Sequence, residues 1–423
     1  MRRPAALVSL SLAAVVVTLV AAVSAQDDDA PPSALTADLP RTGFAPAAAA
    51  SIDTLVESVL EAHGIPGASL TVAYNGNVVL SRGYGFANVE TGEPMSPETR
   101  FLLASVSKSI TAVTALKMVD AGTFALDDAA YSLIQPIEPP PGMAANPEVL
   151  GITVRQMLHH EGGWDRTTSG DPASWERRVM RALGVRNAPT MFDLARYMLA
   201  QPLDFAPGTK AVYSNAGYDI TGVVITRQRQ AFYADTARQL VLGPMGLDGI
   251  KVDVRAPRYM ENEARRYATG GQHMLPGGHP PMNLAAGGWT ARSRDMVEFL
   301  VALSGSRSGT PFLSPGMMAE MTRPSPTVPL RPNGTYFGLG WDTVEPMHGS
   351  FRYAKDGGLP GISTWIEHLP LDPNGPNAQE AGGGTLDWAI FFNAHVENDE
   401  GKVIVGAVTA RLRRALEAID WTP

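Results

Sequence analysis

The sequence contains no cysteine among its 423 residues. This absence excludes disulfide bonds, a thiol nucleophile and a lipid-modified N-terminal cysteine, so packing alone must stabilise the fold. Two signatures of other enzymes are also missing: the Gly-x-Ser-x-Gly elbow and the phosphate-binding Gly-x-x-x-x-Gly-Lys loop. The chain is therefore not expected to be an α/β-hydrolase or an ATPase.

Charge is scarce as well. Charged residues make up 18% of the chain, hydrophobic residues 44%, and the formal net charge is -8. The apolar content is sufficient for a large core, and the length corresponds to roughly two to three domain-sized units. Because the balance is acidic, nucleic acid is not expected as a partner.

The N-terminal segment has the pattern of an export signal. Two arginines precede an apolar run over residues 5–23 that ends in small residues. This pattern predicts a signal peptide over 1–25, cleaved on export to the periplasm or the exterior, and no membrane span in the mature chain. An uncleaved anchor is the alternative, since the run approaches the ~20 residues that cross a bilayer. Residues 26–50, rich in Asp, Ala and Pro, predict a flexible leader.

The folded part is expected to begin with a helix and a hairpin. Ser51 is the predicted N-cap of an amphipathic helix. Two apolar runs, 68–74 and 77–82, then meet at Asn75-Gly76, the strongest short hairpin signal because both residues accept positive φ. A long helix over 105–121 follows.

Strand patterns lie at both ends of the chain and helical patterns lie between them. This order predicts an α/β (α+β) fold: one antiparallel sheet built from 51–125 and 285–423, flanked by helices, with an inserted all-helical region over 126–284. The functional site is expected at their junction. The patterns that carry this prediction are helical over 154–159, 191–200, 293–303 and 403–419, and strand-like over 336–341, 363–368 and 386–395.

The most informative motif is Ser105-Val106-Ser107-Lys108, at the start of the predicted long helix. Residues three apart share a helix face, so the Lys108 amine can lie beside the Ser105 hydroxyl and, with a lowered pKa, take its proton. Only six of the 34 Lys and Arg residues are lysines, and only Lys108 has a serine three positions before it. Arginine cannot act as a base, so a lysine here is significant.

Two further motifs accompany this serine. Tyr213-Ser214-Asn215 is the only Tyr-x-Asn in the chain, and Lys355-Asp356-Gly357 is the only Lys-x-Gly. A tyrosine between the ammonium groups of Lys108 and Lys355 is expected to have a lowered pKa and to shuttle protons. Asn215 can offer an amide donor to a substrate carbonyl.

The three motifs in this order resemble those of class C β-lactamases, D-alanyl-D-alanine carboxypeptidases and related esterases. Four segments near these motifs also resemble the corresponding segments of these enzymes. The resemblance extends from about Ser51 to the final helix. These segments are 83–88 (Gly-Tyr-Gly-Phe-Ala-Asn), 207–209 (Pro-Gly-Thr), 287–289 (Gly-Gly-Trp) and 338–341 (Gly-Leu-Gly-Trp).

The resemblance implies a β-lactamase/transpeptidase-like fold and a serine hydrolase that needs no cofactor. It implies that Ser105 forms the acyl-enzyme, that Lys108 and Tyr213 move protons, and that Lys355 supports the tyrosine and attracts an anionic group. Substrate binding is implied for four residues: Asn215, Asp356, Gly357 and Gly358. The resemblance also implies that the backbone N–H groups of Ser105 and Gly358 form the oxyanion hole.

The substrate stays open among a D-amino-acid peptide, a β-lactam and an ester, all small molecules or peptides. Asp356 departs from the family pattern, where Thr or Ser is usual, and a carboxylate there should weaken binding of a substrate carboxylate. β-Lactams are therefore predicted to be poor substrates. A catalytically silent protein that binds cell-wall fragments is the alternative, although the intact motifs argue against it.

No metal site is expected. His159-His160-Glu161 lacks the second histidine of a helical zinc motif, because Trp164 occupies that position. We expect His160 to be a structural hydrogen-bonding residue.

Overall fold

The computed structural model describes residues 39–252, 259–268, 272–274, 281–377, 384–396 and 405–422. They belong to one unit, Leu35–Pro423. The predicted signal peptide and the first part of the predicted leader lie outside the described residues.

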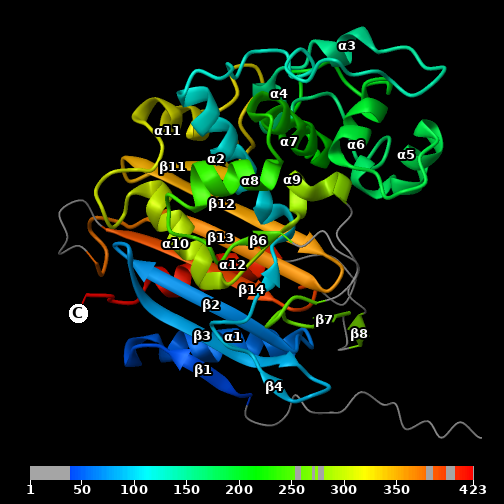
Figure 1. Ribbon diagram of the computed structural model, residues 1–423. Coiled ribbons are helices and arrows are strands. Elements are labelled where there is room, and N and C mark those ends of the chain that lie inside the picture. Colours follow the sequence, from blue (N-terminus) through cyan, green and yellow to red (C-terminus); the bar gives the residue numbers. More distant parts are fainter. Residues whose placement is uncertain are drawn as a thin grey trace, which may run out of the picture. The chain divides into compact units, whose positions relative to one another are not determined.

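The principal element is an antiparallel sheet whose strands come from both ends of the chain (Figure 1). Its strand order is β1-β3-β2-β14-β13-β12-β11-β10, with β4 paired to β3. The two chain ends meet where β2 pairs with β14, with Leu70 opposite Ile390. The predicted fold class is confirmed. The strands are β1 (Arg41–Phe44), β2 (Gly67–Tyr74), β3 (Asn77–Asn88), β4 (Glu93–Pro94), β10 (Tyr336–Gly338), β11 (Trp341–Met347), β12 (Ser350–Leu359), β13 (Ile362–Pro370) and β14 (Thr385–Phe392).

The predicted hairpin joins β2 and β3. Asn75 and Gly76 form the turn with φ of 47° and 74°, the left-handed values that a two-residue hairpin requires. The two turn residues were therefore sufficient to predict this hairpin from the sequence.

The start of the fold differs from the prediction. The interpretation of 26–50 as a leader was wrong from residue 41 onward, because β1 pairs with β3 and places Arg41 opposite Tyr84. Ser51 is not an N-cap either, since the helix α1 (Ala50–Ala62) already includes it. The pairing partner of β1 is about forty residues away, so local composition did not reveal this strand.

Both faces of the sheet are covered. Alternate residues of β14 enter different cores: Trp388 and Ile390 pack with α1 and α12 (Val405–Glu417), whereas Ala389 and Phe391 join the core on the opposite face. The helix α10 (Ser293–Ser304) lies on that second face against β2 and β14.

The segment 126–284 lies on the α2 side of the sheet, and its regular structure consists mainly of helices separated by long loops (Figure 1). Its only described strands are three two-residue pieces. Its elements are α3 (Pro147–Leu150), α4 (Val154–Leu158), α5 (Glu176–Leu183), α6 (Met191–Met198), α7 (Asn215–Arg229), α8 (Tyr233–Ala237), β6 (Lys251–Val252), β7 (Arg266–Tyr267), β8 (His273–Met274) and the start of α9 (Leu284–Gly287).

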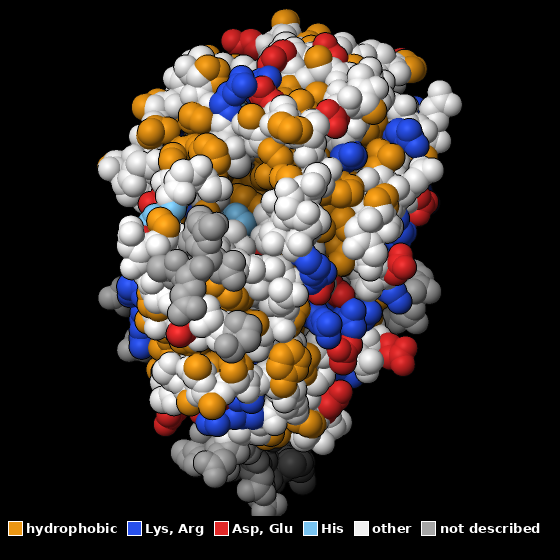
Figure 2. Space-filling view, turned by 90° about the vertical axis from the view of Figure 1, so that its left-hand side faces the viewer, with side chains coloured by type: hydrophobic (Ala, Val, Ile, Leu, Met, Phe, Trp, Pro, Cys, Tyr) orange, Lys and Arg blue, Asp and Glu red, His pale blue; other side chains and the backbone are white. Residues whose placement is uncertain are grey.

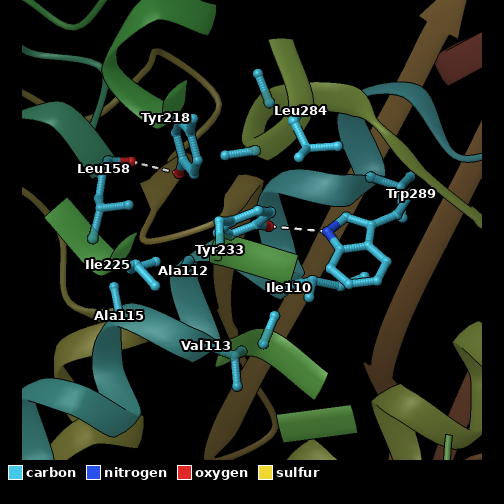
Figure 3. Close-up of a cluster of buried hydrophobic side chains, with 14 of the residues drawn as sticks. Ile110, Ala112, Val113, Ala115, Leu158, Tyr218, Ile225, Tyr233, Leu284 and Trp289 are labelled. Atoms are coloured by element: carbon cyan, nitrogen blue, oxygen red, sulfur yellow. Dashed lines mark hydrogen bonds between the residues drawn. The ribbon is translucent and has the colours of Figure 1, made fainter. Parts of the chain in front are cut away.

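The helix α2 (Ser107–Asp120) forms the centre of this second core. Most of its side chains are buried, including the polar ones, so it is enclosed on nearly every side. Figure 3 shows its apolar side chains among those of α4, α7, α8 and α9. Tyr218 donates to Leu158 O at 2.8 Å and Trp289 Nε1 donates to Tyr233 Oη at 2.9 Å, which fixes the surroundings of α2.

Candidate active site

Ser105 lies in the turn that leads from β5 (Phe101–Leu102) into α2. A 3-10 turn, Ala104–Val106, continues directly into the helix. Ala104 has a φ of 48°, a conformation that costs free energy for a residue with a Cβ atom, and its side chain is buried. Such strain persists only where the surroundings enforce it, which is typical of functional turns.

Lys108 lies one turn further along α2 and is fully buried. Its Nζ is 2.6 Å from Asn215 Oδ1, 2.8 Å from Ala286 O and 3.2 Å from Ser105 Oγ. Burial, followed by the nearby charge of Lys355, lowers the pKa of Lys108 to about 7. A substantial fraction of Lys108 is therefore a neutral amine at neutral pH.

These three contacts match the needs of a neutral amine. An uncharged amine has two N–H donors and one lone pair. Asn215 Oδ1 and Ala286 O, the two nearer oxygens, accept the two N–H bonds, and the lone pair is then directed to the Ser105 hydroxyl. Lys108 is thus oriented to accept the serine proton.

The amide of Asn215 is held in the orientation that this arrangement needs. Its Nδ2 donates to Asp171 Oδ2 at 2.7 Å, so its oxygen faces Lys108. Asn215 is the first residue of α7, and Asp171 caps the short turn Pro172–Ser174. Asp171 accepts only one of the two N–H groups of the Asn215 amide, and Asn215 lines the cleft, so its role as an amide donor to the substrate stays a prediction.

Tyr213 donates a hydrogen bond from Oη to Ser105 Oγ at 2.6 Å. Its ring centroid is 5.0 Å from Lys108 Nζ, 5.1 Å from Lys355 Nζ and 4.9 Å from the Arg166 guanidinium. The expected lowering of its pKa is nevertheless wrong: burial, reinforced by the charge of Asp342, raises the pKa of Tyr213 well above its usual value. The phenol therefore keeps its proton at neutral pH.

Lys355, on β12, is paired with acidic neighbours. Its Nζ forms an ion pair with Asp342 Oδ2, donates to Asp356 O at 2.9 Å and lies 3.7 Å from Asp356 Oδ1. Burial raises the pKa of Asp342 to about 7, against the effect of Lys355. Asp356 lines the cleft and has 44% of its side chain exposed, so it faces the site as the sequence suggested.

Gly357 brings β12 against the serine turn. A Cβ atom at this position would collide with Leu103 O and lie 3.1 Å from Ser105 N. Only glycine permits this approach, which places the next residue, Gly358, beside open space in the cleft. Ser105 and Gly358 therefore both line the cleft, and the oxyanion hole implied for their backbone N–H groups stays a prediction.

The cleft has a volume of about 940 Å³ and is lined by residues of both the sheet and the helical region. All the predicted site residues line it except the two buried lysines, whose Nζ atoms lie next to Ser105 or Tyr213. On the face shown in Figure 2, acidic and basic side chains are interspersed among hydrophobic ones.

Three side chains of the site were not found by sequence reasoning: Asp171, Asp342 and Arg166. None belongs to one of the three motifs, and Asp171 is 44 residues from its partner Asn215. Asp342 directly follows the segment 338–341 that carries part of the family resemblance, which is the only signal that could have indicated it.

The expectation for His160 is confirmed. Its Nδ1 accepts a hydrogen bond from Ser214 N at 3.0 Å, and its ring stacks on Tyr213 at 4.5 Å. His160 therefore positions the tyrosine. In the described part of the chain, no group of three His, Asp or Glu side chains could hold a metal ion.

A serine held between a lysine and a tyrosine, beside an antiparallel sheet, defines the class of β-lactamases and penicillin-binding proteins. The chain belongs to the β-lactamase family, whose Beta-lactamase family model matches residues 52–405.

Curated relatives match part of the chain. Protein flp of Staphylococcus aureus (strain COL) is 30% identical over 46% of this chain and 36% of its own length. Esterase EstB of Burkholderia gladioli is 32% identical over 47% of this chain and 50% of its own length. The matches thus span about a third to a half of these relatives.

Solved structures share the fold over most of the chain. The D-amino acid amidase from Ochrobactrum anthropi SV3, complexed with D-phenylalanine, has a TM-score of 0.65 and 22% identity, and covers 87% of this chain and 99% of its own. The octameric penicillin-binding protein homologue from Pyrococcus abyssi has a TM-score of 0.62 and 20% identity, and covers 83% and 74%. Within the described residues, we find no helix long and apolar enough to span a membrane.

Proposed function

We propose that the chain is a serine hydrolase that forms an acyl-enzyme at Ser105 and cleaves an ester, amide or peptide bond. One observation carries this proposal: the Ser105 hydroxyl lies between a phenol that keeps its proton and an amine whose pKa is lowered to about 7. Family membership supports it, as do relatives named as an esterase and an amidase.

The geometry suggests the order of proton transfers. Lys108 takes the Ser105 proton as Oγ attacks the carbonyl carbon, and the backbone N–H groups of Ser105 and Gly358 stabilise the resulting oxyanion. Tyr213 gives its proton to the leaving group and is reprotonated from Lys108. Water then attacks the acyl-serine by the same route in reverse, which restores Ser105.

The charge around Lys355 limits the substrate. In related enzymes this lysine is implied to attract a substrate carboxylate, but here Asp342 and Asp356 already surround it. Esters and amides without a carboxylate at that position are the favoured substrates, and β-lactams should acylate slowly. Export through cleavage after Ala25 is also part of this proposal, supported by the composition of residues 1–25.

The test is intact-mass spectrometry after exposure to p-nitrophenyl acetate, a fluorophosphonate and a fluorescent penicillin. We expect rapid acylation by the first two compounds and slow acylation by the third. Ser105→Ala should remove every adduct while leaving thermal unfolding nearly unchanged. A Ser105→Ala protein that still hydrolyses the ester at the parental rate would contradict the mechanism. It would favour the alternative of a catalytically silent binding protein.

A further inference from the structure

Asp219 is a fully buried carboxyl group near the site that does not line the cleft. It lies on α7, one helical turn after Asn215, so the two side chains share a face of this helix. Among the residues that the structure describes, it forms no salt bridge. Burying a carboxyl group without an ion-pair partner costs free energy, so its place beside the site calls for an explanation.

Asp219 holds the segment of α9 that faces Lys108. Its Oδ1 accepts a hydrogen bond from Ala286 N at 3.0 Å. From the other side, Thr111 of α2 donates to Ala285 O at 2.7 Å. The carbonyl of Ala285 and the N–H of Ala286 belong to one peptide unit, which is therefore fixed at both ends by side chains of α2 and α7.

This peptide unit determines where the next carbonyl points. Lys108 Nζ donates to Ala286 O at 2.8 Å and to Asn215 Oδ1 at 2.6 Å. Both acceptors of the amine thus depend on one face of α7, because Asn215 provides one directly and Asp219 fixes the other through the peptide. A shift of either acceptor would turn the lone pair of the amine away from Ser105.

The charge of Asp219 also acts on Lys108. Asp219 Oδ2 is buried and accepts no hydrogen bond from any described residue, so no donor offsets a negative charge on this oxygen. Burial raises the pKa of Asp219 well above its usual value, and the charge of Lys108 lowers it. Burial and the charge of Lys355 lower the pKa of Lys108, and the charge of Asp219 raises it. Each of the two buried charges is therefore more stable when the other is present.

Other ionisable groups face this pair from the surrounding elements. Burial keeps the tyrosines protonated and His160 neutral, because it raises the pKa of each tyrosine and lowers that of the histidine. The remaining groups are the same in the parent and in any Asp219 variant, so a comparison of the two reports the effect of Asp219. The groups are His160, Asp171, Tyr213, Tyr218, Tyr233, Asp342, Lys355 and Asp356.

We propose that Asp219 is a positioning residue of the reaction: it fixes the Ala286 carbonyl that orients Lys108, and its carboxylate stabilises the ammonium that Lys108 becomes on taking the Ser105 proton. This inference rests on the proposed hydrolase function. Packing alone does not account for the carboxyl group, since an apolar side chain of similar size would fill the same space without the cost of burying a polar group.

Two substitutions separate the two parts of this role. Asp219→Asn keeps an oxygen that can accept from Ala286 N and removes the charge, whereas Asp219→Ala removes both. For each variant, kcat/KM for p-nitrophenyl acetate and the second-order rate constant of acylation by a fluorophosphonate are measured across the pH range around neutrality. Both quantities report the ionisation of Lys108 in the free enzyme.

In Asp219→Asn we expect the acid limb of both profiles to move below its parental midpoint, because the ammonium form of Lys108 loses a charge that favours it. The plateau above the limb should fall by about threefold or less. In Asp219→Ala the acid limb should move in the same direction, and the plateau should fall about tenfold further because the Ala286 N–H loses its acceptor.

Asp53→Asn is the matched control. Asp53 is also a buried carboxyl group, but it lies on α1, whose core is on the opposite face of the sheet, and it accepts from Arg82 and Tyr84. Its substitution should leave the midpoint of the acid limb unchanged even if it reduces stability. Thermal unfolding shows whether each variant is folded, and Asp219→Asn alone decides the matter if Asp219→Ala does not fold.

The outcomes separate this inference from the function on which it rests. Absence of p-nitrophenyl acetate hydrolysis in the parent enzyme would overturn the hydrolase function itself. If the parent hydrolyses the ester, an unchanged or higher midpoint in Asp219→Asn would overturn the role of Asp219 and leave the hydrolase function intact. Equal plateaus in folded Asp219→Asn and Asp219→Ala would also overturn it, because the bond to Ala286 would then not orient Lys108.

Discussion

Lys108 is the residue whose ionisation should set the pH dependence of the reaction. Its folded pKa is about 7, lowered from the usual lysine value, and only the neutral amine can take the Ser105 proton. For p-nitrophenyl acetate, kcat/KM should therefore rise with pH and reach half its plateau near pH 7. Lys108→Arg keeps the charge but has no accessible neutral form, so it should reduce kcat/KM by ~10²–10⁴. Near-normal turnover of this variant would leave Lys108 as an electrostatic neighbour only.

Asp171 is predicted to position Asn215 rather than to contact the substrate. Asp171→Ala releases the amide that faces Lys108 and removes a negative charge, and both changes lower the pKa of Lys108. We expect kcat to fall about tenfold and the acid limb of the pH profile to move below its parental midpoint.

Asp171→Asn provides the control for this prediction. It can still accept from Asn215 Nδ2, so it should recover most of the rate while keeping the shifted acid limb. An acid limb at the parental position in both variants would show that Asp171 has only a structural role.

Sequence reasoning found those residues whose chemistry is local. Ser105 and Lys108 are three residues apart on one helical turn, so their proximity follows from helix geometry. Tyr213 and Lys355 were identified because each lies in a motif that occurs once in the chain, and the family resemblance then implied their roles. The direction of the Tyr213 pKa was wrong because it depends on burial, which no local pattern reports.

At the scale of elements, the contact between α7 and α9 controls where Lys108 is held. Ala286 of α9 accepts from Lys108, and α7 approaches α9 through Gly222. A Cβ atom at Gly222 would lie 2.6 Å from Ala285 Cβ and 2.9 Å from Met191 Sδ, so one of the helices must move. Gly222→Ala should reduce stability by about 1–3 kcal/mol and lower kcat, because Ala286 O shifts away from Lys108.

The control for Gly222 is Gly316→Ala on α11 (Pro315–Thr322), where an added Cβ meets no atom within 4 Å. This change should not reduce thermal stability or kcat. If Gly222→Ala behaved in the same way as Gly316→Ala, the α7–α9 contact would not be the constraint on Lys108.

Helices and strands were likewise predicted where the pattern that defines them is local, and missed where it depends on a distant partner. The β2–β3 hairpin was predicted because its turn residues and apolar runs lie within one short segment. The helix α2 was also predicted, and Gly122, with a φ of 71°, directly follows its end as a C-terminal glycine is expected to. The strand β1 was missed because it consists of four residues with no apolar alternation of their own, and only its pairing with β3 defines it. Asp342 was missed for the same reason, because its role in the site comes from an ion pair with Lys355, which lies on the neighbouring strand.

At the scale of the whole molecule, the helices α1 and α12 cover the face of the sheet opposite α2, and only the first residues of α12, Val405 and Gly406, also line the cleft. The helix α12 packs against α1 and β13, and its buried side chains join the core that contains β2 and β14. This core is separate from the one around α2, which holds Ser105 and Lys108 in place. Stability and catalysis should therefore respond differently to a change in α12.

Leu412→Ala tests this separation. Leu412 is 2% exposed on α12, and truncating a buried leucine typically costs about 2–5 kcal/mol of unfolding free energy. Because Ser105, Lys108 and Tyr213 belong to the other side of the sheet, kcat/KM measured well below the unfolding temperature should stay at the parental value. Arg411→Ala, exposed on the same helix, controls for any change to α12 and should alter neither quantity by much. Chemical denaturation and steady-state kinetics on the same preparations decide the matter: a parallel loss of stability and kcat/KM in Leu412→Ala would mean that the two cores are mechanically coupled through the sheet.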